Sequence, residues 1–336
     1  MMLARAVTVP KLIAGVSAFA VILLLAALAS RTETRPSFDF FKKPNAGVSQ
    51  HLLARLNLAE KIWGQAVKDR EKMVEHVGLD RDFPDGYNNP YNVWDFARPS
   101  FFCPHDLERV GKLGDGGKVV CGMSRYEKEA PGPSSAENPA REMVIYSLGV
   151  NRDSSFEEAM MERTNVQIWG YDFSVDSWAS EVAKGPFTSR AHFTKAGIGK
   201  ETDPKRDPPF YTVQDLMKAN GHEYVDIIKM DIEGAEFDAL TSFVEHTIKE
   251  AGDKQPVLPF GQLLLEVHFW TDKEQLHIPR KLETWMKWWS SLEELGLRPV
   301  NNEDNWIGDV AFGKARFMEY TLINVLNAED NILLWG

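Results

Sequence analysis

Three apolar stretches of the chain end on polar side chains that could do chemistry. The residues that follow them are Asp172 after 166–171, Asp231 and Glu233 after 225–230, and Glu266 and His268 after 263–265. Continuous apolar runs of this length are typical of parallel strands that are buried on both faces. Ligands bind outside the carboxyl ends of the strands in open α/β sheets, so we expect these side chains to line one crevice.

Strand and helix patterns alternate from residue 143 onward, and they predict the sheet that positions these residues. The expected strands are 143–148, 166–171, 191–196, 225–230 and 262–267, with two late strands near 310–312 and 317–325. The expected helices are 154–163, 174–182, 213–220, 235–247 and 279–295. Five successive strand–helix units predict an α/β fold with a doubly wound sheet, parallel except for one late strand.

The amino-terminal part of the chain predicts a membrane segment. Residues 12–29 carry no charge, and at about 1.5 Å per residue they are long enough to cross a thin bilayer. We predict a transmembrane signal anchor there, with a cleaved signal peptide as the alternative. Either one places the folded part in the lumen of the endoplasmic reticulum or Golgi, or outside the cell if the segment is cleaved. The expected segments are a short tail (1–11), the anchor (12–29), a linker (30–50), an amphipathic helix with an entry element (51–140) and the main domain (141–336).

Charge and cysteine content narrow the classes of partner. The formal net charge is −11, which argues against non-specific binding to nucleic acid and favours a small-molecule or glycan partner. The chain has two cysteines, Cys103 and Cys121, both beyond the expected anchor. In an oxidising lumen they are expected to form a disulfide, and two buried free thiols are the alternative.

A single glycine after the first strand indicates the type of cofactor. A dinucleotide site needs three glycines in the pattern G-x-G-x-x-G, because the backbone must approach a pyrophosphate. Only Gly149 is present, which disfavours a dehydrogenase. S-adenosylmethionine has no phosphate groups, so one sharp turn is enough. We expect Gly149, Asn151 and Asp172 to bind it, with Asp172 on the ribose hydroxyls; a helix N-cap is the alternative role of Asp172.

Four segments of the chain resemble methyltransferase-like proteins related to the FkbM-type family. They are 145–157, Asp115-Gly116-Gly117-Lys118 leading to Cys121, 229–236 and 264–270. The resemblance spans about residues 102–324. It implies a Rossmann-like class I S-adenosylmethionine-dependent methyltransferase domain over 141–336, with helices on both faces of the sheet. It also implies an amino-terminal membrane anchor.

Methyl transfer to oxygen requires an acceptor held in line with the methyl group and a base for its proton. His268 is the first candidate base because its ordinary pKa is about 6.5. Asp231 and Glu266 are further catalytic candidates, Asp231 is also expected to face the cationic cofactor, and Glu233 is expected to bind substrate. The alternatives are a structural histidine and carboxylates that cap a helix. We expect no metal, although Asp231, Glu266 and His268 could supply ligands to a divalent ion.

Two classes of function remain from the sequence. The first is a membrane-anchored methyltransferase that methylates an oxygen of a glycan or a small hydroxylated or carboxylated acceptor. The second is a non-catalytic methyltransferase-fold domain that serves as a tethered interaction module. The intact set of candidate site residues favours the enzyme.

Overall fold

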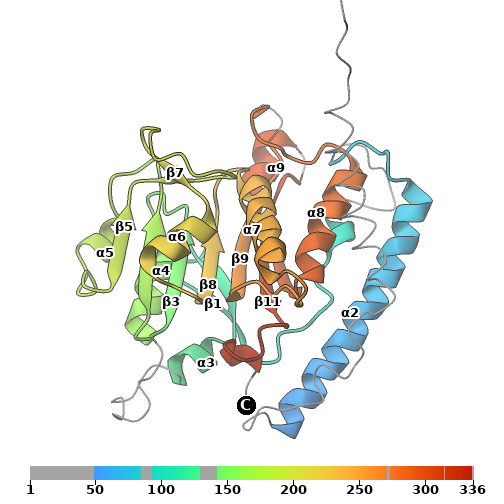
Figure 1. Ribbon diagram of the computed structural model, residues 1–336, viewed down its shortest axis with the longest axis horizontal. Coiled ribbons are helices and arrows are strands. Elements are labelled where there is room, and N and C mark those ends of the chain that lie inside the picture. The colour runs from blue at the N-terminus through green and yellow to red at the C-terminus, as the bar shows by residue number, and fades with distance from the viewer. Residues whose placement is uncertain (1–48, 85–92, 129–141, 271–272, 314, 335–336) are drawn as a thin grey trace, which may run out of the picture. The chain divides into compact units, whose positions relative to one another are not determined.

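A seven-stranded sheet forms the centre of the described structure (Figure 1). The computed structural model describes residues 49–84, 93–128, 142–270, 273–313 and 315–334. In spatial order the strands are β10 (Leu297–Asp304), β11 (Phe317–Asn324), β9 (Phe260–His268), β8 (Val225–Met230), β3 (Val144–Leu148), β4 (Gln167–Tyr171) and β5 (Ala191–Thr194).

The strand directions confirm the predicted mixed sheet. The pairs β3–β4, β3–β8, β4–β5 and β8–β9 are parallel, whereas β11 is antiparallel to both of its neighbours, β9 and β10. One late strand therefore runs against the others, as expected. Every residue of β8 and of β9 is buried, which explains why these strands have continuous apolar runs in the sequence.

Helices connect the parallel strands and cover the sheet. They are α4 (Ser155–Arg163), α5 (Ser180–Ala183), α6 (Val213–Asn220), α7 (Glu236–Ala251), α8 (Leu282–Glu294) and α9 (Trp306–Phe312). Of these, α6, α7 and α8 lie on the face of the sheet toward the viewer in Figure 1. A small parallel pair, β6 (Gly197–Ile198) and β7 (Phe210–Tyr211), follows β5.

The tryptophans of α8 belong to the core. Trp285 and Trp289 are fully buried, and the Trp285 ring stacks on Phe83 with centroids 5.4 Å apart. Trp285 also contacts Phe269, which follows β9, edge to face at 5.4 Å. These side chains pack the helix onto the sheet.

The predicted amphipathic helix is α2 (Gln50–Val77), and it packs on the main domain. The Ser49 hydroxyl caps its start by accepting a hydrogen bond from the Leu52 amide nitrogen at 3.1 Å. Arg70 forms a bidentate ion pair with Glu293 of α8. Arg298 of β10 donates to Glu60 at 2.9 and 3.0 Å. Charged pairs therefore join α2 to α8 and β10.

A hairpin precedes the main domain and is tied to the central sheet. It consists of β1 (Leu107–Val110) and β2 (Lys118–Cys121) and lies between η3 (Val93–Ala97) and α3 (Met123–Lys128). Cys103 and Cys121 form the predicted disulfide. Near the end of the chain, η4 (Ile332–Leu334) lies against this region, and the carbonyl oxygen of Leu333 is 2.8 Å from His105 Nε2.

Two expected elements were wrong, and one strand was not expected. The expected helix 174–182 is reduced to α5, because Asp172 holds Ser174 in a turn and the first helical residue is Ser180. The expected strand 310–312 belongs to α9, whose first turn is capped when Asn305 Oδ1 accepts from the Ile307 amide nitrogen at 3.0 Å. The edge strand β10 was not among the expected strands; it contains Pro299, and its pairing with β11 is irregular there.

No described helix is both long enough and apolar enough to cross a membrane. The predicted anchor at 12–29 lies outside the described residues, as do the tail and nearly all of the expected linker.

Candidate active site

The carboxyl ends of β3 and β8 meet at Gly149 and Asp231. The amide nitrogen of Asp231 donates to the carbonyl oxygen of Leu148 at 2.9 Å. Gly149 has φ +82°, and a Cβ atom added there would stand 1.8 Å from the carbonyl oxygen of Asp231. Glycine allows this approach because it adopts the left-handed region freely and has no side chain. The expected cofactor turn is therefore in direct contact with the backbone of Asp231, the residue that carries the expected catalytic carboxylate.

Asp172, which follows β4, organises the turn after Gly149. Its Oδ2 accepts hydrogen bonds from the amide nitrogens of Val150 at 2.9 Å and Asn151 at 2.8 Å. Its Oδ1 accepts from the amide and hydroxyl groups of Ser174, both at 2.7 Å. Burial alone would raise the pKa of Asp172, but these donors, Asn151 first, hold it below its ordinary value.

This arrangement bears on the predicted role of Asp172. A carboxylate has about four lone-pair positions, and all four are engaged within the protein. A ribose hydroxyl would have to replace one of these donors, so the ribose contact stays a prediction. The alternative of a helix N-cap is wrong, because the N-cap of α5 is Ala179.

A buried ion pair supports the Gly149 turn. Lys229 of β8 donates to the carbonyl oxygen of Gly149 at 2.7 Å and lies 3.4 Å from Glu157 Oε1 of α4. Ser147 donates to the same Glu157 oxygen at 2.5 Å. Sequence reasoning missed this network. Its signal was a lysine inside an apolar strand, since a buried charge requires a partner.

Three carboxylates from adjacent strands lie next to this turn. They belong to Asp231 after β8, Glu266 on β9 and Glu319 on β11, and the last two are register partners. Lys118 of β2 lies among them, with Nζ 3.2 Å from Asp231 Oδ2 and 3.6 Å from Glu266 Oε2, and it donates to Glu319. We call these four residues, together with His268 and Glu236, the acidic cluster. The strand ends thus bring Asp231 and Glu266 together, as expected.

His268, at the end of β9, lies between carboxylates. Its Nδ1 is 2.9 Å from Glu236 Oε1, and its Nε2 is 3.5 Å from Glu266 Oε1 and 3.8 Å from Asp231 Oδ1. Burial alone would lower the pKa of His268. The charge and hydrogen bond of Glu236, and then the charges of Glu266 and Asp231, raise it to about 10. The ring is therefore protonated at neutral pH and cannot accept a proton until it loses one. The base role of His268 stays a prediction that this geometry disfavours.

The carboxylates of the cluster hold protons unequally. Burial alone would raise the pKa of Asp231, but the charges of Lys118 and then His268 hold it well below its usual range. Burial raises the pKa of Glu266 well above its ordinary value, and the charges of Asp231 and Glu319 raise it further. Neighbouring carboxylates do not all ionise, since like charges repel. Asp231 is therefore ionised at neutral pH, and Glu266 keeps its proton to a higher pH than an ordinary glutamate does.

Two sets of side chains in the cluster have the spacing of metal ligands. The first set is Asp231, Glu266 and His268, and the second is Asp115, Glu266 and Glu319. Within each set the possible ligand atoms lie within 4.8 Å of one another. Lys118 already contacts three of these carboxylates, and a protonated His268 has no lone pair to donate. The expectation of no metal stays a prediction.

Glu233 and Asn151 lie outside the acidic cluster. Glu233 has φ 60°, and its half-exposed carboxylate is 3.7 Å from Lys273. Asn151 has φ 51° and offers its amide nitrogen to Asp172. Each positive φ in a residue other than glycine costs on the order of 1 kcal/mol. Both residues flank glycine turns at the carboxyl edge of the sheet, and their predicted binding roles stay predictions.

Sequence reasoning missed Lys118, Glu319 and Asn305 as parts of the site. The Asn305 amide group donates to Glu266 Oε1 at 2.6 Å and to Asp115 Oδ1 at 3.2 Å. The run Asp115-Gly116-Gly117-Lys118 stood out in the sequence, but nothing in its spacing indicated that it lies against β9 and β11.

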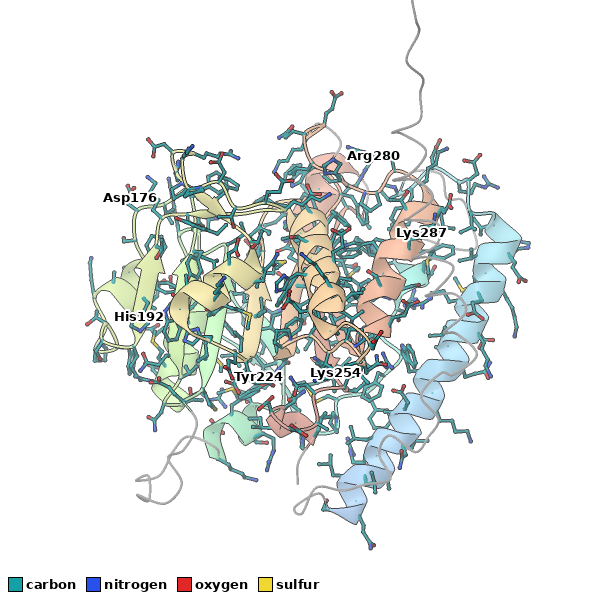
Figure 2. All side chains as sticks on the ribbon, viewed as in Figure 1. Asp176, His192, Tyr224, Lys254, Arg280 and Lys287 are labelled. Atoms are coloured by element: carbon teal, nitrogen blue, oxygen red, sulfur yellow. A yellow bond between two sulfur atoms is a disulfide. The ribbon has the colours of Figure 1, made fainter. Side chains whose placement is uncertain are left out.

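A separate cavity lies at the opposite edge of the sheet. It has a volume of about 470 Å³ and is lined by the last turns of α6 and α7 and by residues that precede β8 and β9. Lys254, one of its lining residues, is at the lower edge in Figure 2, whereas Asp176, which follows β4, is toward the upper edge. No predicted site residue lines this cavity, so it is separate from the candidate active site.

Several solved structures show low similarity to the chain. The fibrillarin pre-rRNA processing protein of Methanococcus jannaschii matches with TM-score 0.31 and 11% identity, over 66% of this chain and 98% of the other. A putative S-adenosylmethionine-dependent methyltransferase of Listeria monocytogenes matches with TM-score 0.31 and 11% identity, over 60% of this chain and 98% of the other.

The 1,6-didemethyltoxoflavin-N1-methyltransferase of Burkholderia thailandensis, with S-adenosylhomocysteine bound, matches with TM-score 0.30 and 14% identity, over 55% of this chain and 72% of the other. At these TM-scores the likeness to all three structures is too small to bear on the function of this chain. No protein with a curated description matches its sequence.

A family model described as a methyltransferase domain matches residues 56–307, which is well over half of the chain. Together with the order and directions of the strands, it confirms the class I methyltransferase domain that the sequence predicts. It also supports S-adenosylmethionine as the cofactor, whereas the relationship to the FkbM-type family stays a prediction. The chain belongs to this family of methyltransferase domains.

Proposed function

We propose that the protein transfers a methyl group from S-adenosylmethionine to an oxygen of a glycan or another small hydroxylated or carboxylated acceptor. The observation that carries the proposal is the contact between the Gly149 turn and Asp231. It places an ionised carboxylate next to the turn where the cofactor is expected. When bound, S-adenosylmethionine supplies an electrophilic methyl group on a cationic sulfur, and a negative side chain at this edge suits that charge.

The residues of the cluster then have separate roles. Asp231 accepts a hydrogen bond from the acceptor hydroxyl and takes its proton as the new oxygen–carbon bond forms. A carboxylate of low pKa is sufficient, because the oxygen becomes strongly acidic as it gains the methyl group. The raised pKa of Glu266 favours its protonated form, which can donate a hydrogen bond to the acceptor and help to orient it, while the Asn305 amide group donates to Glu266 Oε1 and holds that carboxyl group in place.

An exposed apolar surface beside the cluster supports an acceptor with an apolar face, such as a sugar ring. Trp306 follows Asn305 directly, and its side chain is 70% exposed. Ile307 and Val310, on the same short helix α9, are also exposed. Exposed apolar groups gathered beside polar side chains are typical of binding sites. Hydroxyl groups of a sugar would find acceptors in Asp231 and Asp115.

We also propose that the domain works in the secretory pathway, tethered by residues 12–29. The disulfide between Cys103 and Cys121 supports an oxidising compartment. A protease-protection assay on sealed microsomes tests this location. The full-length protein should be protected until detergent is added, and digestion of the domain in intact microsomes would contradict a luminal location.

The cofactor part of the proposal is tested by calorimetry on the full-length protein. We expect binding of both S-adenosylmethionine and S-adenosylhomocysteine and no binding of NADH. The acceptor is then sought by supplying cells with and without the protein with methyl-labelled methionine and comparing labelled glycans and metabolites. Folded protein that binds NADH and neither of the first two ligands would contradict the proposal.

A further inference from the structure

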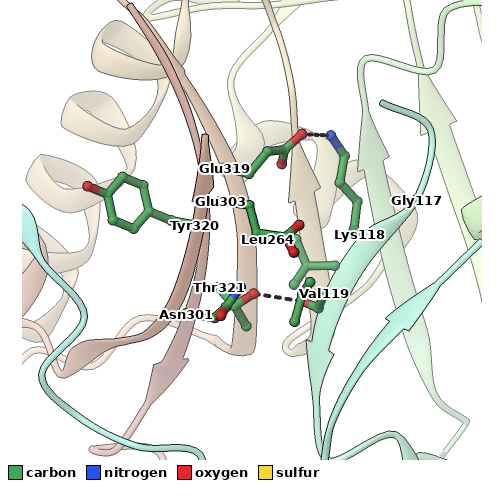
Figure 3. Close-up of a pocket in the computed structure, with 9 residues that line it drawn as sticks. All are labelled: Gly117, Lys118, Val119, Leu264, Asn301, Glu303, Glu319, Tyr320 and Thr321. Carbon is green, nitrogen blue, oxygen red and sulfur yellow. Dashed lines mark hydrogen bonds and ion pairs between the residues drawn. The ribbon is translucent and has the colours of Figure 1, made fainter. Parts of the chain in front are cut away.

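The β1–β2 hairpin is fixed against the central sheet on both sides of Lys118. Thr321 of β11 donates its hydroxyl hydrogen to the carbonyl oxygen of Val119 at 2.6 Å (Figure 3). Gln262 of β9 accepts from the Cys121 amide nitrogen at 2.8 Å and donates to the Cys121 carbonyl oxygen at 3.2 Å. The disulfide holds Cys121 from the other side. These contacts set the position of β2 relative to β9 and β11.

The turn before Lys118 is equally constrained. A Cβ atom on Gly117 would stand 2.0 Å from the carbonyl oxygen of Lys112, and one on Gly116 would collide with the carboxylate of Asp153. Arg109 donates to the carbonyl oxygen of Gly117 at 2.6 Å and pairs with Glu303. The turn that leads to Lys118 is therefore closely packed against Lys112, Asp153 and Arg109.

Lys118 has almost no access to water. Its side chain is 3% exposed, and the cavity beside it has a volume of about 10 Å³, room for about one water molecule. Its partners are carboxylates from three strands, as Figure 3 shows for Glu319. Burial alone would lower the pKa of Lys118, but the charges of Asp231, Glu319 and Glu266 raise it, so the ammonium group stays charged. Lys118 is thus a fixed cation and has no proton-accepting role.

Lys118 does not act on Asp231 alone. The other charged groups that face Asp231 are His268 and Glu266 of β9, Glu319 of β11 and Lys229 of β8. Lys118 makes the closest charged contact of Asp231, through Oδ2 at 3.2 Å, whereas His268 lies 3.8 Å from Oδ1. Lys229 is directed to the carbonyl oxygen of Gly149 and to Glu157.

We propose that Lys118 is a positioning residue, which the β1–β2 hairpin inserts among the carboxylates to hold Asp231 ionised and in place for the acceptor. The hairpin is then part of the active site, although it precedes the main domain in the sequence. This inference rests on the proposed function, because Asp231 is the group that meets the acceptor there.

The test is a titration of Asp231 in the full-length protein. Carbon-13 labelling of aspartate carboxyl groups gives an NMR signal that Asp231→Asn removes and so identifies. In the wild type this signal should stay at the ionised position down to the lowest pH at which the protein is folded. In Lys118→Met its midpoint should rise by about 1–3 pH units, the usual effect of a neighbouring opposite charge. Lys118→Arg, which keeps the charge, should restore most of the wild-type behaviour.

A second pair of measurements separates this inference from the proposed function. Calorimetry with S-adenosylmethionine should give an affinity for Lys118→Met within about threefold of the wild type, since Lys118 does not contact the Gly149 turn. Wild-type protein that binds no S-adenosylmethionine would refute the proposed function, while the titration would still decide the effect of Lys118 on Asp231. With the acceptor identified, kcat of Lys118→Met should fall roughly 10²-fold with little change in KM.

A double variant covers the outcome in which loss of the buried cation prevents folding. Lys118→Met with Glu319→Gln removes one charge of each sign and leaves Asp231 without its cation. Its midpoint should rise as well, by less than in Lys118→Met alone, because the like charge of Glu319 is also removed. An unchanged titration of Asp231 in a folded Lys118→Met protein or in the folded double variant would overturn the proposal.

Discussion

Replacement of His268 by alanine should destabilise the protein strongly, because it leaves Glu236 buried without its cation. Glu236 is fully buried, and His268 Nδ1 lies 2.9 Å from its Oε1. Removal of one partner of a buried ion pair costs about 3–5 kcal/mol. Each kcal/mol of lost stability lowers the melting temperature of a domain of this size by about 2–4 °C, so the melting temperature of His268→Ala should lie about 6–20 °C below that of the wild type.

The pH dependence of stability gives a second value for the contribution of His268 to the free energy of unfolding. The pKa of His268 is raised from 6.5 to about 10 in the folded protein. A group whose pKa rises on folding stabilises fully below its unfolded pKa, and that contribution is lost as pH rises through the folded pKa. The loss therefore falls between about pH 6.5 and 10. At 1.36 kcal/mol per pH unit it amounts to at most about 5 kcal/mol.

The assay is urea unfolding of the wild type and His268→Ala at a series of pH values from 6 to 10. The difference in free energy of unfolding between the two should be largest at pH 6 and should shrink toward pH 10. His268→Ala combined with Glu236→Gln is the matched control. It should recover part of the loss, since no buried charge is left unpaired and the glutamine oxygen can still accept from the Ile232 amide nitrogen.

A small loss would refute this reasoning. If His268→Ala costs less than about 1 kcal/mol and the difference is the same at pH 6 and pH 10, the imidazole is neutral in the folded protein. His268 would then return as the leading candidate for the general base. A nitrogen-15 NMR spectrum at pH 8 provides a direct check, because a protonated ring carries hydrogen on both nitrogens.

Three further predictions concern the cofactor turn and the hairpin. Asp172→Ala leaves the buried amide groups of the turn without their acceptor, and lost hydrogen bonds of this kind cost about 1–3 kcal/mol. The affinity for S-adenosylmethionine, measured by calorimetry, should therefore fall by roughly 10–100-fold. An unchanged affinity would contradict this role of Asp172. Gly149→Ala should lower the free energy of unfolding in urea by more than about 2 kcal/mol, because alanine disfavours the positive φ and its Cβ atom would collide with Asp231. An unfolding midpoint equal to that of the wild type would contradict this prediction. Replacement of both Cys103 and Cys121 by serine should lower the free energy of unfolding in urea by about 3 kcal/mol, because the disulfide closes a loop of 18 residues. As the control, reduction of the wild-type disulfide should lower it by the same amount. An unchanged free energy of unfolding would contradict the prediction.

The sequence predicted the central sheet well because buried parallel strands leave a strong signal. The strands at 225–230 and 262–267 appear as β8 and β9, the latter longer by a few residues. Because neighbouring parallel strands end at the same edge, the proximity of Asp231, Glu266 and His268 followed from these runs alone. The expected helix 213–220 appears as α6 with the same bounds, and the Thr212 hydroxyl caps it by accepting from the Asp215 amide nitrogen at 3.2 Å.

The remainder of the site could not be predicted, since it depends on contacts between distant parts of the chain. Lys118 is 113 residues from Asp231 and 201 residues from Glu319 in sequence. No local periodicity indicates where a short hairpin docks on a sheet. The protonation of His268 could not be predicted either, because it depends on Glu236, which lies 32 residues away in sequence. Glu236 also supports the first turn of α7 by accepting from the Ile232 amide nitrogen at 3.0 Å, and the same oxygen contacts His268.

The charges of the cluster explain why the hairpin and the main domain depend on each other. Asp231, Glu236, Glu266 and Glu319 place four carboxyl groups in a largely buried space, and their cations are Lys118 and His268. Burial of like charges without partners is strongly unfavourable. A domain that began at residue 141, the predicted boundary, would keep all four carboxyl groups and lose Lys118. It would also lose the groups on β2 that hydrogen-bond to Gln262 and Thr321. The cluster reaches its charge state only when the hairpin is docked, so the proton distribution that leaves Asp231 ionised is a property of the two parts together.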